Sequence, residues 1–204
     1  MTGPRAIIGF AVRFGLCYGL LAAPWPGLQK AYSAGFRILG GAVFRGFGPG
    51  GHVEFLPAAI AYEGGADTEI VTGADGVPVV GVNPVGSRLM FYLPLAETAA
   101  LILAANVSWR RRGIALGSGL LLALGFVVLR LWVVLMVWFS DERPWAIYQI
   151  QPWARALLSH ADEVLNTAPT ATFLVPVLIW IVVVFRREDW DRIIGARAAG
   201  QPTG

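Results

Sequence analysis

The sequence predicts an all-α membrane protein with four transmembrane helices, a small extracytoplasmic amphipathic helix and a β-hairpin insertion. Three observations support this class. Of the 204 residues, 56% are hydrophobic and 14% are charged, whereas soluble domains carry about a quarter charged residues. The mean hydropathy is +0.61, and apolar runs close to the roughly 20 residues that cross a hydrocarbon core recur along the chain. One small core cannot bury so much apolar surface, so we expect lipid to cover part of it.

Composition also excludes several kinds of site. The single cysteine, Cys17, excludes an internal disulfide framework and any site built from several cysteines. The two histidines, His52 and His160, are far apart in sequence, so we expect no metal and no other cofactor. The isoelectric point is near 9.4, but the arginines lie at segment ends without an aromatic platform. We therefore expect the lipid bilayer, and not a nucleic acid, as a partner.

Four apolar segments are predicted to span the bilayer. The first resembles a signal peptide, but Arg13 interrupts its apolar run and LLAAPWPG is a poor cleavage site, so we expect it to be retained. Pro24 and Pro26 close this segment. The predicted spans are Ala6–Ala23, Met90–Val107, Ile114–Phe139 and Thr170–Phe185.

Basic residues close to the spans predict the orientation. The stretch SWRRRG, residues 108–113, joins the second and third spans in a very short loop, and FRRED follows the fourth. Both are expected on the cytoplasmic side, which places both termini there as well. Four tryptophans are then expected in an outer interfacial belt: Trp132, Trp138, Trp145 and Trp153.

Residues 26–89 are predicted to lie outside the membrane. The stretch LQKAYSAGFRILGGAVFRGFG has apolar residues at helical spacing, which predicts an amphipathic helix lying on the bilayer. Short β-branched runs with glycine and proline between them follow. They predict a small antiparallel hairpin or meander with Ala74-Asp75-Gly76 at a turn. A piece of about 35 residues cannot bury its own core, so it should rest on the helices or the bilayer.

A second outer segment is predicted at residues 140–168. Apolar residues at helical spacing predict a short amphipathic helix that also carries His160: Trp153, Leu157, Leu158, Val164 and Leu165. The expected organisation is a first transmembrane helix at 1–25, an outer segment at 26–89, a transmembrane hairpin with an Arg-rich cytoplasmic loop at 90–139, an outer amphipathic segment at 140–168, a fourth transmembrane helix at 169–187 and a cytoplasmic tail at 188–204.

Two predicted spans each contain one charged residue, Glu97 in the second and Arg130 in the third. A charge inside a span costs about 3 kcal/mol or more, so an unpaired one needs a role. Counted from the outer span ends, the two lie at depths of roughly 11 and 14 Å. We expect an ion pair, which either clamps two helices or marks a site reached from outside. His160 is either solvated or a proton-transfer group that meets Arg130 from above.

One stretch resembles a known family. LILAANVSWRRRGIALGSGLLLALGFVVLRLWVVL is similar to the exosortase/archaeosortase membrane proteins, nearest the short H-type exosortases. The resemblance implies a multi-pass protein of the bacterial inner membrane that acts on C-terminal sorting tails of exported proteins, as a peptidase or transpeptidase. It also implies that Arg130 matches the family arginine, Glu97 a glutamate that follows the family cysteine, and His160 the family histidine.

The sequence departs from this family at the catalytic cysteine. That cysteine would fall at about Leu93, and no cysteine, serine or threonine stands at 91–95. Transpeptidation needs an activated nucleophile, and Cys17 on the first span is expected to be a small apolar filler. The nearest other polar candidates are Asn83, Ser87 and Tyr92.

Three functions stay open from the sequence. The first is an exosortase-like protein that binds a sorting tail or a partner without peptidase chemistry. The second is an active transpeptidase with a displaced nucleophile, and the third is a structural accessory subunit of a membrane complex. The missing cysteine favours the first and third, and the retained charges favour the first because a scaffold has no need of them. The candidate site residues are Arg130, His160 and Glu97.

Overall fold

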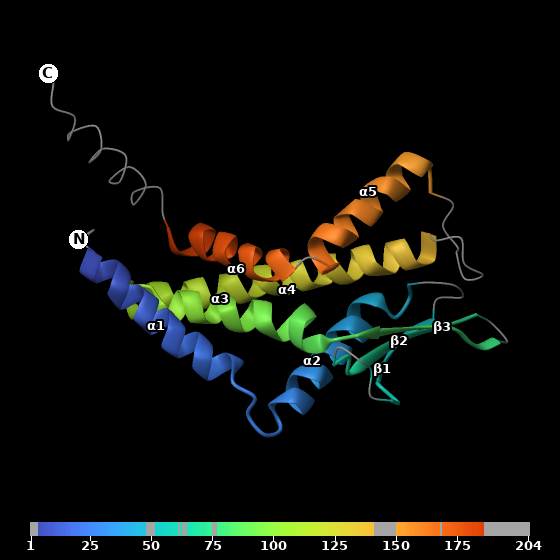
Figure 1. The fold of residues 1–204 in the computed structure, drawn as a ribbon, viewed down its shortest axis with the longest axis horizontal. Helices are drawn as coiled ribbons and strands as arrows, with labels where there is room; N and C mark the ends of the chain where they lie inside the picture. Colours follow the sequence, from blue (N-terminus) through green and yellow to red (C-terminus); the bar gives the residue numbers. More distant parts are fainter. Residues whose placement is uncertain are drawn as a thin grey trace, which may run out of the picture.

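The computed structural model describes residues 4–47, 52–60, 62, 65–74, 77–140, 150–167 and 169–185. These residues are mostly helical and include one three-stranded antiparallel sheet (Figure 1), which confirms a β insertion in a mainly helical chain. The elements in chain order are α1 (Pro4–Ala22), α2 (Leu28–Phe44), β1 (His52–Pro57), β2 (Thr68–Ala74), β3 (Val77–Val85), the π-helix η2 (Arg88–Tyr92), α3 (Leu93–Ala104), α4 (Trp109–Ser140), α5 (Pro152–Asp162), the π-helix η3 (Glu163–Thr167) and α6 (Pro169–Val184).

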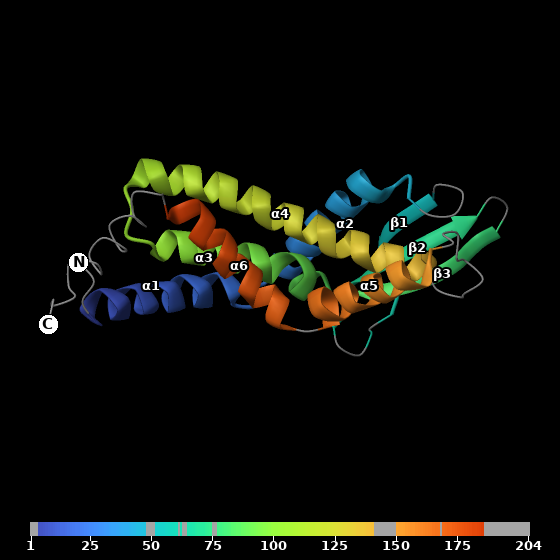
Figure 2. The same cartoon turned by 90° about the horizontal axis from the view of Figure 1, so that it is seen from above.

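Helix α4 forms the long axis of the molecule. Its 32 residues make it about 48 Å long, which is longer than a hydrocarbon core of about 30 Å. At one end α1, α3 and α6 lie beside its first half, and at the other end α2, the sheet and α5 lie beside its second half (Figures 1 and 2). Figure 2 shows α3 and α6 between α1 and α4.

The helices α3, α4 and α6 approach one another closely at Gly119 of α4. A Cβ atom there would lie 2.6 Å from Cδ1 of Ile102, 3.4 Å from Cγ2 of Thr98 and 3.6 Å from Cγ2 of Val183. A carbon–carbon contact is optimal at about 3.5–4.0 Å. The missing side chain of Gly119 therefore makes room for Ile102 of α3.

The predicted meander is confirmed, with strand order β1-β2-β3 and both pairs antiparallel. Val53 pairs with Thr72, and Phe55 pairs with Ile70. Because side chains alternate along a strand, these four residues lie on one face of the sheet, and all four are buried.

The predicted turn falls between β2 and β3. Strand β2 ends at Ala74 and β3 begins at Val77. Asp75 and Gly76, which were expected in the turn, lie outside the described residues.

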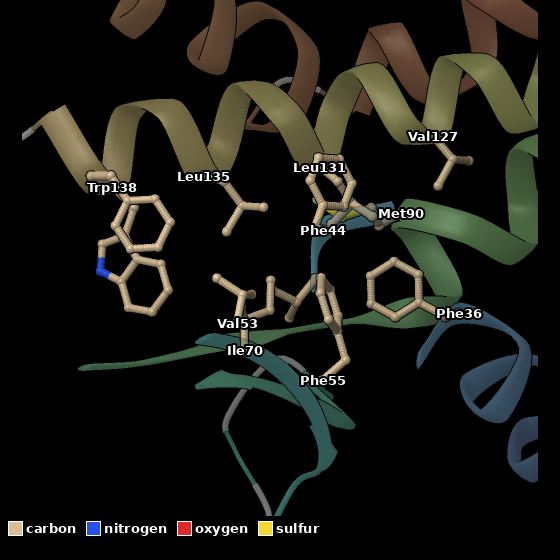
Figure 3. Packing of buried hydrophobic residues seen from close by; sticks show 12 residues of the cluster. Phe36, Phe44, Val53, Phe55, Ile70, Met90, Val127, Leu131, Leu135 and Trp138 are labelled. Carbon is tan, nitrogen blue, oxygen red and sulfur yellow. The ribbon is translucent and has the colours of Figure 1, made fainter. Parts of the chain in front are cut away.

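The buried face of the sheet packs against α2 and the second half of α4 (Figure 3). The ring of Phe55 lies directly over Gly40 of α2, and Phe36 meets that ring edge-on with centroids 6.1 Å apart. The sheet is too small to bury its own core, so it shares one with the two helices. This cluster includes Phe36, Phe44, Val53, Phe55, Ile70, Val85, Met90, Val127, Leu131, Leu135, Trp138 and Phe139.

The amphipathic helix predicted in the outer segment is present as α2, and its buried side, from Phe36 to Phe44, packs on the sheet. The predicted belt of tryptophans needs correction at one position. Trp138, expected in an interfacial belt, is 5% exposed and belongs to the same core, whereas Trp153 is 68% exposed. Trp145 lies outside the described residues.

The helices at the predicted spans differ in length from the expectation. Helices α1, α3 and α6 have 19, 12 and 16 residues. Within the described part of the chain, α4 is the one helix long and apolar enough to cross a bilayer by itself. Helix α5 with η3 passes the same test together with α6, but the pair is bent by 79°. Helix length therefore supports one span, or two with the bent pair.

The Arg-rich stretch lies in the first turn of α4, which begins at Trp109, and not in a loop as predicted. Arg111 donates to the carbonyl oxygen of Val184 at the end of α6. Arg112 donates to the carbonyl oxygen of Ala105, just after α3, at 2.9 Å. The last carbonyls of a helix lack helical partners and attract cations, so these arginines cap two neighbouring helices.

Candidate functional site

Arg130 is buried where α4 passes η2 and η3, and is 3% exposed. Its Nε donates to Oδ1 of Asn166 at 3.0 Å, and its Nη1 donates to the carbonyl oxygen of Leu89 at 3.2 Å. The amide of Asn166 donates in turn to Oδ1 of Asp162 at 2.9 Å. We call Arg130, Leu89, Asn166 and Asp162 the Arg130 junction.

The π-helix η2 explains why the carbonyl of Leu89 is available. In this turn the N–H of Leu93 donates to the carbonyl oxygen of Arg88, five residues earlier. The carbonyl of Leu89 would by the same register need the N–H of residue 94, but Pro94 has none. Arg130 supplies the missing donor, so a guanidinium and a proline together fix the start of α3 against α4.

The predicted ion pair between Glu97 and Arg130 is not formed. Within the described residues the hydrogen bonds of Arg130 go to an amide and a backbone carbonyl, and Oε2 of Glu97 is buried without a hydrogen-bond partner. Glu97 is 6% exposed. It lies on α3, which packs against α1.

The expected pairing fails because the two residues lie at different levels along α4. Arg130 is level with Leu89, whereas Thr98 of α3 is level with Gly119. Leu89 and Glu97 are eight positions apart in sequence, which corresponds to roughly 12 Å along the helix axis. Phe139 is not the outer end of a span as predicted, because α4 continues past the start of α3 and onto the sheet.

Of the two alternatives for His160, the structure shows the solvated residue, and His160 does not approach Arg130. It is on α5 with its side chain 78% exposed, and its Nδ1 lies 3.7 Å from Oε2 of Glu163. The part of α5 and η3 that does reach Arg130 is Asp162 and Asn166. The structure therefore places Arg130, Glu97 and His160 at three separate positions.

Ser87 is held in a structural bond and is closed to substrate. Its hydroxyl donates to Oδ2 of Asp67 at 2.7 Å and its backbone N–H donates to Oδ1 at 3.0 Å. Ser87 is fully buried. The carboxylate of Asp67 therefore ties the end of the sheet to the start of η2, and a nucleophile needs access that Ser87 lacks.

The remaining nucleophile candidates are also distant from Arg130 or engaged. Cys17 lies on α1, which packs against α3, and α3 separates it from α4 (Figure 2). The hydroxyl of Tyr92 donates to the carbonyl oxygen of Leu21 at the end of α1. Asn83 lies on β3 opposite Ile70.

Sequence reasoning missed Asn166 and Asp67, which make the polar bonds of this region. For Asn166 the signal was its spacing from Asp162, because residues four apart on a helix are neighbours. For Asp67 no local signal exists, since its partner Ser87 is 20 positions away.

The Arg130 junction keeps a guanidinium buried and joins three segments of the chain, which are η2, α4 and the end of α5 with η3. In the part of the chain that the structure describes, no three histidine, cysteine, aspartate or glutamate side chains are grouped to hold a metal ion.

The comparisons with known proteins give no relative. No family model matches the chain, and neither a curated protein nor a solved structure is detectably similar to it. The exosortase resemblance therefore stays a prediction.

Proposed function

We propose that this chain is an exosortase-like integral membrane protein of a bacterial C-terminal protein-sorting system, which binds a sorting tail or a partner and does not cut it. In this proposal α1, η2 with α3, α4 and α6 cross the inner membrane, and both termini are cytoplasmic. The sheet and α2 lie outside, on the part of α4 that extends beyond the bilayer.

Exposed apolar side chains on the bundle helices support the membrane part of the proposal. Leu16 of α1, Leu121 of α4 and Val182 of α6 are each 70% or 71% exposed. Soluble monomers seldom leave large contiguous apolar patches open. Lipid is the solvent that such faces need, and the length of α4 leaves room for both a span and an outer part.

The hydrogen bonds of Arg130 support a binding role without cleavage. Its described hydrogen bonds reach an amide and a backbone carbonyl, and none reaches a hydroxyl or a thiol. Ser87 is bound to Asp67, and Cys17 lies beyond α3. Peptidase or transpeptidase chemistry through a covalent intermediate needs a side-chain nucleophile with a base in hydrogen-bond reach, so binding without cleavage fits this geometry better.

Comparison of bacterial host cells with and without the chain tests this proposal. An exported host protein with a C-terminal motif, an apolar span and an arginine cluster should co-purify with the tagged chain and keep its tail. Mass spectrometry of the C-terminus gives the tail length in both strains. A tail that is cut only when the chain is present would show peptidase activity and contradict the proposal.

A second function, an accessory subunit of a membrane complex, is favoured by α5. None of its residues is buried, and Trp153 and Leu157 are 68% and 63% exposed. Their spacing of four places both on one side of the helix. If α5 docks on another subunit, Trp153→Ser with Leu157→Ser should release that subunit in detergent while the chain itself stays folded.

A further inference from the structure

A hollow of about 290 Å³ opens where α1 turns into α2. Its polar side is formed by the start of η2 and by one tyrosine of α2, and its rim by the turn that follows α1. The residues that line it are Ala22, Ala23, Pro24, Trp25, Pro26, Gly27, Leu28, Gln29, Tyr32, Arg88 and Tyr92.

Arg88 supplies a positive charge that is held in place and remains accessible. Its Nη2 donates to the carbonyl oxygen of Ala22 at 3.2 Å, and the residue is exposed. An arginine has five N–H donors, and within the described residues Arg88 has no ion pair. The nearby carboxylate of Asp67 is occupied by two bonds from Ser87. Most of the guanidinium can therefore receive an anion.

The tyrosines make one wall of the hollow. The rings of Tyr32 and Tyr92 stack with centroids 4.8 Å apart, and Tyr92 is anchored to the end of α1. The hydroxyl of Tyr32 has no hydrogen-bond partner among the described residues. Burial and then the charge of Asp67 raise the pKa of Tyr32 above its ordinary value. A tyrosine hydroxyl is protonated at neutral pH, so that of Tyr32 can donate to an anion beside Arg88.

An apolar stripe runs along α1 to this hollow. Trp25, at its outer end, is 53% exposed and its indole N–H donates to the carbonyl oxygen of Leu20 at 2.7 Å. Tryptophan at such a place is typical of the membrane interface. The stripe repeats every four residues, which keeps it on one side of the helix, and its members are all exposed: Ile8, Val12, Leu16 and Leu20.

We propose that this hollow binds the phosphate of a phospholipid of the outer leaflet, with Arg88 and Tyr32 donating to the phosphate oxygens and the acyl chains lying along the apolar stripe of α1. The inference rests on the proposed function in that it places α1 in the bilayer, with the end of α1 at Ala22 on the outer side. A free phosphate shares the headgroup chemistry, but only a lipid uses both the cation and the stripe. Anionic lipids should be preferred over phosphatidylcholine, because their headgroups carry no cation that would be repelled by Arg88.

Native mass spectrometry of the full chain, released from nanodiscs of phosphatidylcholine with phosphatidylglycerol, tests this. Wild type should retain phosphatidylglycerol in preference to phosphatidylcholine. Arg88→Gln should lower that retention by about tenfold, the effect of losing a charged hydrogen-bond donor. Arg88→Lys should keep most of it. Arg37→Gln removes a cation of α2 that does not line the hollow, and should retain lipid like wild type. Equal retention by Arg88→Gln and Arg37→Gln would overturn the proposal.

Two further arms complete the test. Tyr32→Phe keeps the ring stack and removes one donor, so it should lower retention even if Arg88→Gln does not fold; unchanged retention would count against the site. Inorganic phosphate added in detergent should displace lipid weakly, and displacement as effective as by short-chain phosphatidylglycerol would identify a free-phosphate site instead. Carbonate extraction separates the two proposals: a chain that stays in membranes but retains lipid independently of Arg88 contradicts this inference alone.

Discussion

Two adjacent glycines of α2 provide a sharp test of how the sheet is held. A Cβ atom added at Gly40 would lie 2.5, 2.6 and 2.7 Å from three ring atoms of Phe55, whereas one added at Gly41 would meet nothing within 4 Å. Both changes to alanine favour the helix equally, by about 1 kcal/mol. The difference between the two variants therefore isolates the contact with Phe55.

The size of that difference follows from the geometry. Carbon atoms pack best at about 3.5–4.0 Å, so the ring of Phe55 would have to retreat by about 1 Å. Phe55 is buried and Phe36 stands edge-on beside it, which blocks an easy escape. Overpacking of this kind costs about 1–3 kcal/mol. For a chain of this size, each 1 kcal/mol changes the melting temperature by about 2–4 °C.

Thermal unfolding in one detergent, followed by fluorescence-detected size exclusion, measures the effect. Gly40→Ala should melt several degrees below Gly41→Ala, and Gly41→Ala should melt at or slightly above wild type. Adding Phe55→Leu to Gly40→Ala should recover part of the loss by making space. If Gly40→Ala is as stable as Gly41→Ala, α2 does not pack on β1 as described.

Three other predictions concern the polar residues of the bundle. Arg130→Met and Asn166→Leu should each destabilise the chain by about 1–3 kcal/mol by leaving a buried polar partner unsatisfied, and the double variant should lose less than the sum in a thermal double-mutant cycle. Glu97→Gln should lower the free energy of unfolding little, and its effect should add to that of Arg130→Met within about 0.5 kcal/mol because the two residues do not touch. Strong coupling between the two changes would show that Glu97 and Arg130 do form an ion pair. Cys17→Ala should leave folding and tail binding unchanged by co-purification, and a loss of binding with normal folding would assign Cys17 a role in binding.

Much of the fold was predictable because helical spacing of apolar residues and turn residues are local signals. The helices α2, α5 and α6 and the β meander were expected close to their observed positions. The first turn of α4 was expected as a loop because SWRRRG separates two apolar runs. Two of them instead cap the ends of α3 and α6, and those ends are distant in sequence.

The candidate site was harder to predict because composition does not tell whether an apolar side chain contacts lipid or is buried in protein. The stretch LWVVLMVWF after Arg130 was expected to be a span end, but it packs on the sheet and α2. With Phe139 as the end of a span, Arg130 was expected at the level of Glu97, and this expected level led to the predicted ion pair. The carbonyl that Arg130 binds depends on the π-turn before Pro94, and apolar periodicity carries no information about such a turn.

The most direct test of the membrane arrangement is the side from which two single cysteines are labelled in a Cys17→Ala background. Leu56 of β1 and Trp109 at the start of α4 are 41% and 78% exposed, so Leu56→Cys and Trp109→Cys should both be reactive. In intact cells, whose outer membrane is made permeable, a membrane-impermeant maleimide should label Leu56→Cys. Trp109→Cys should react only after the inner membrane is opened. Labelling of both from the same side, or release of the chain by carbonate, would contradict a bilayer crossed between the sheet and the arginine turn.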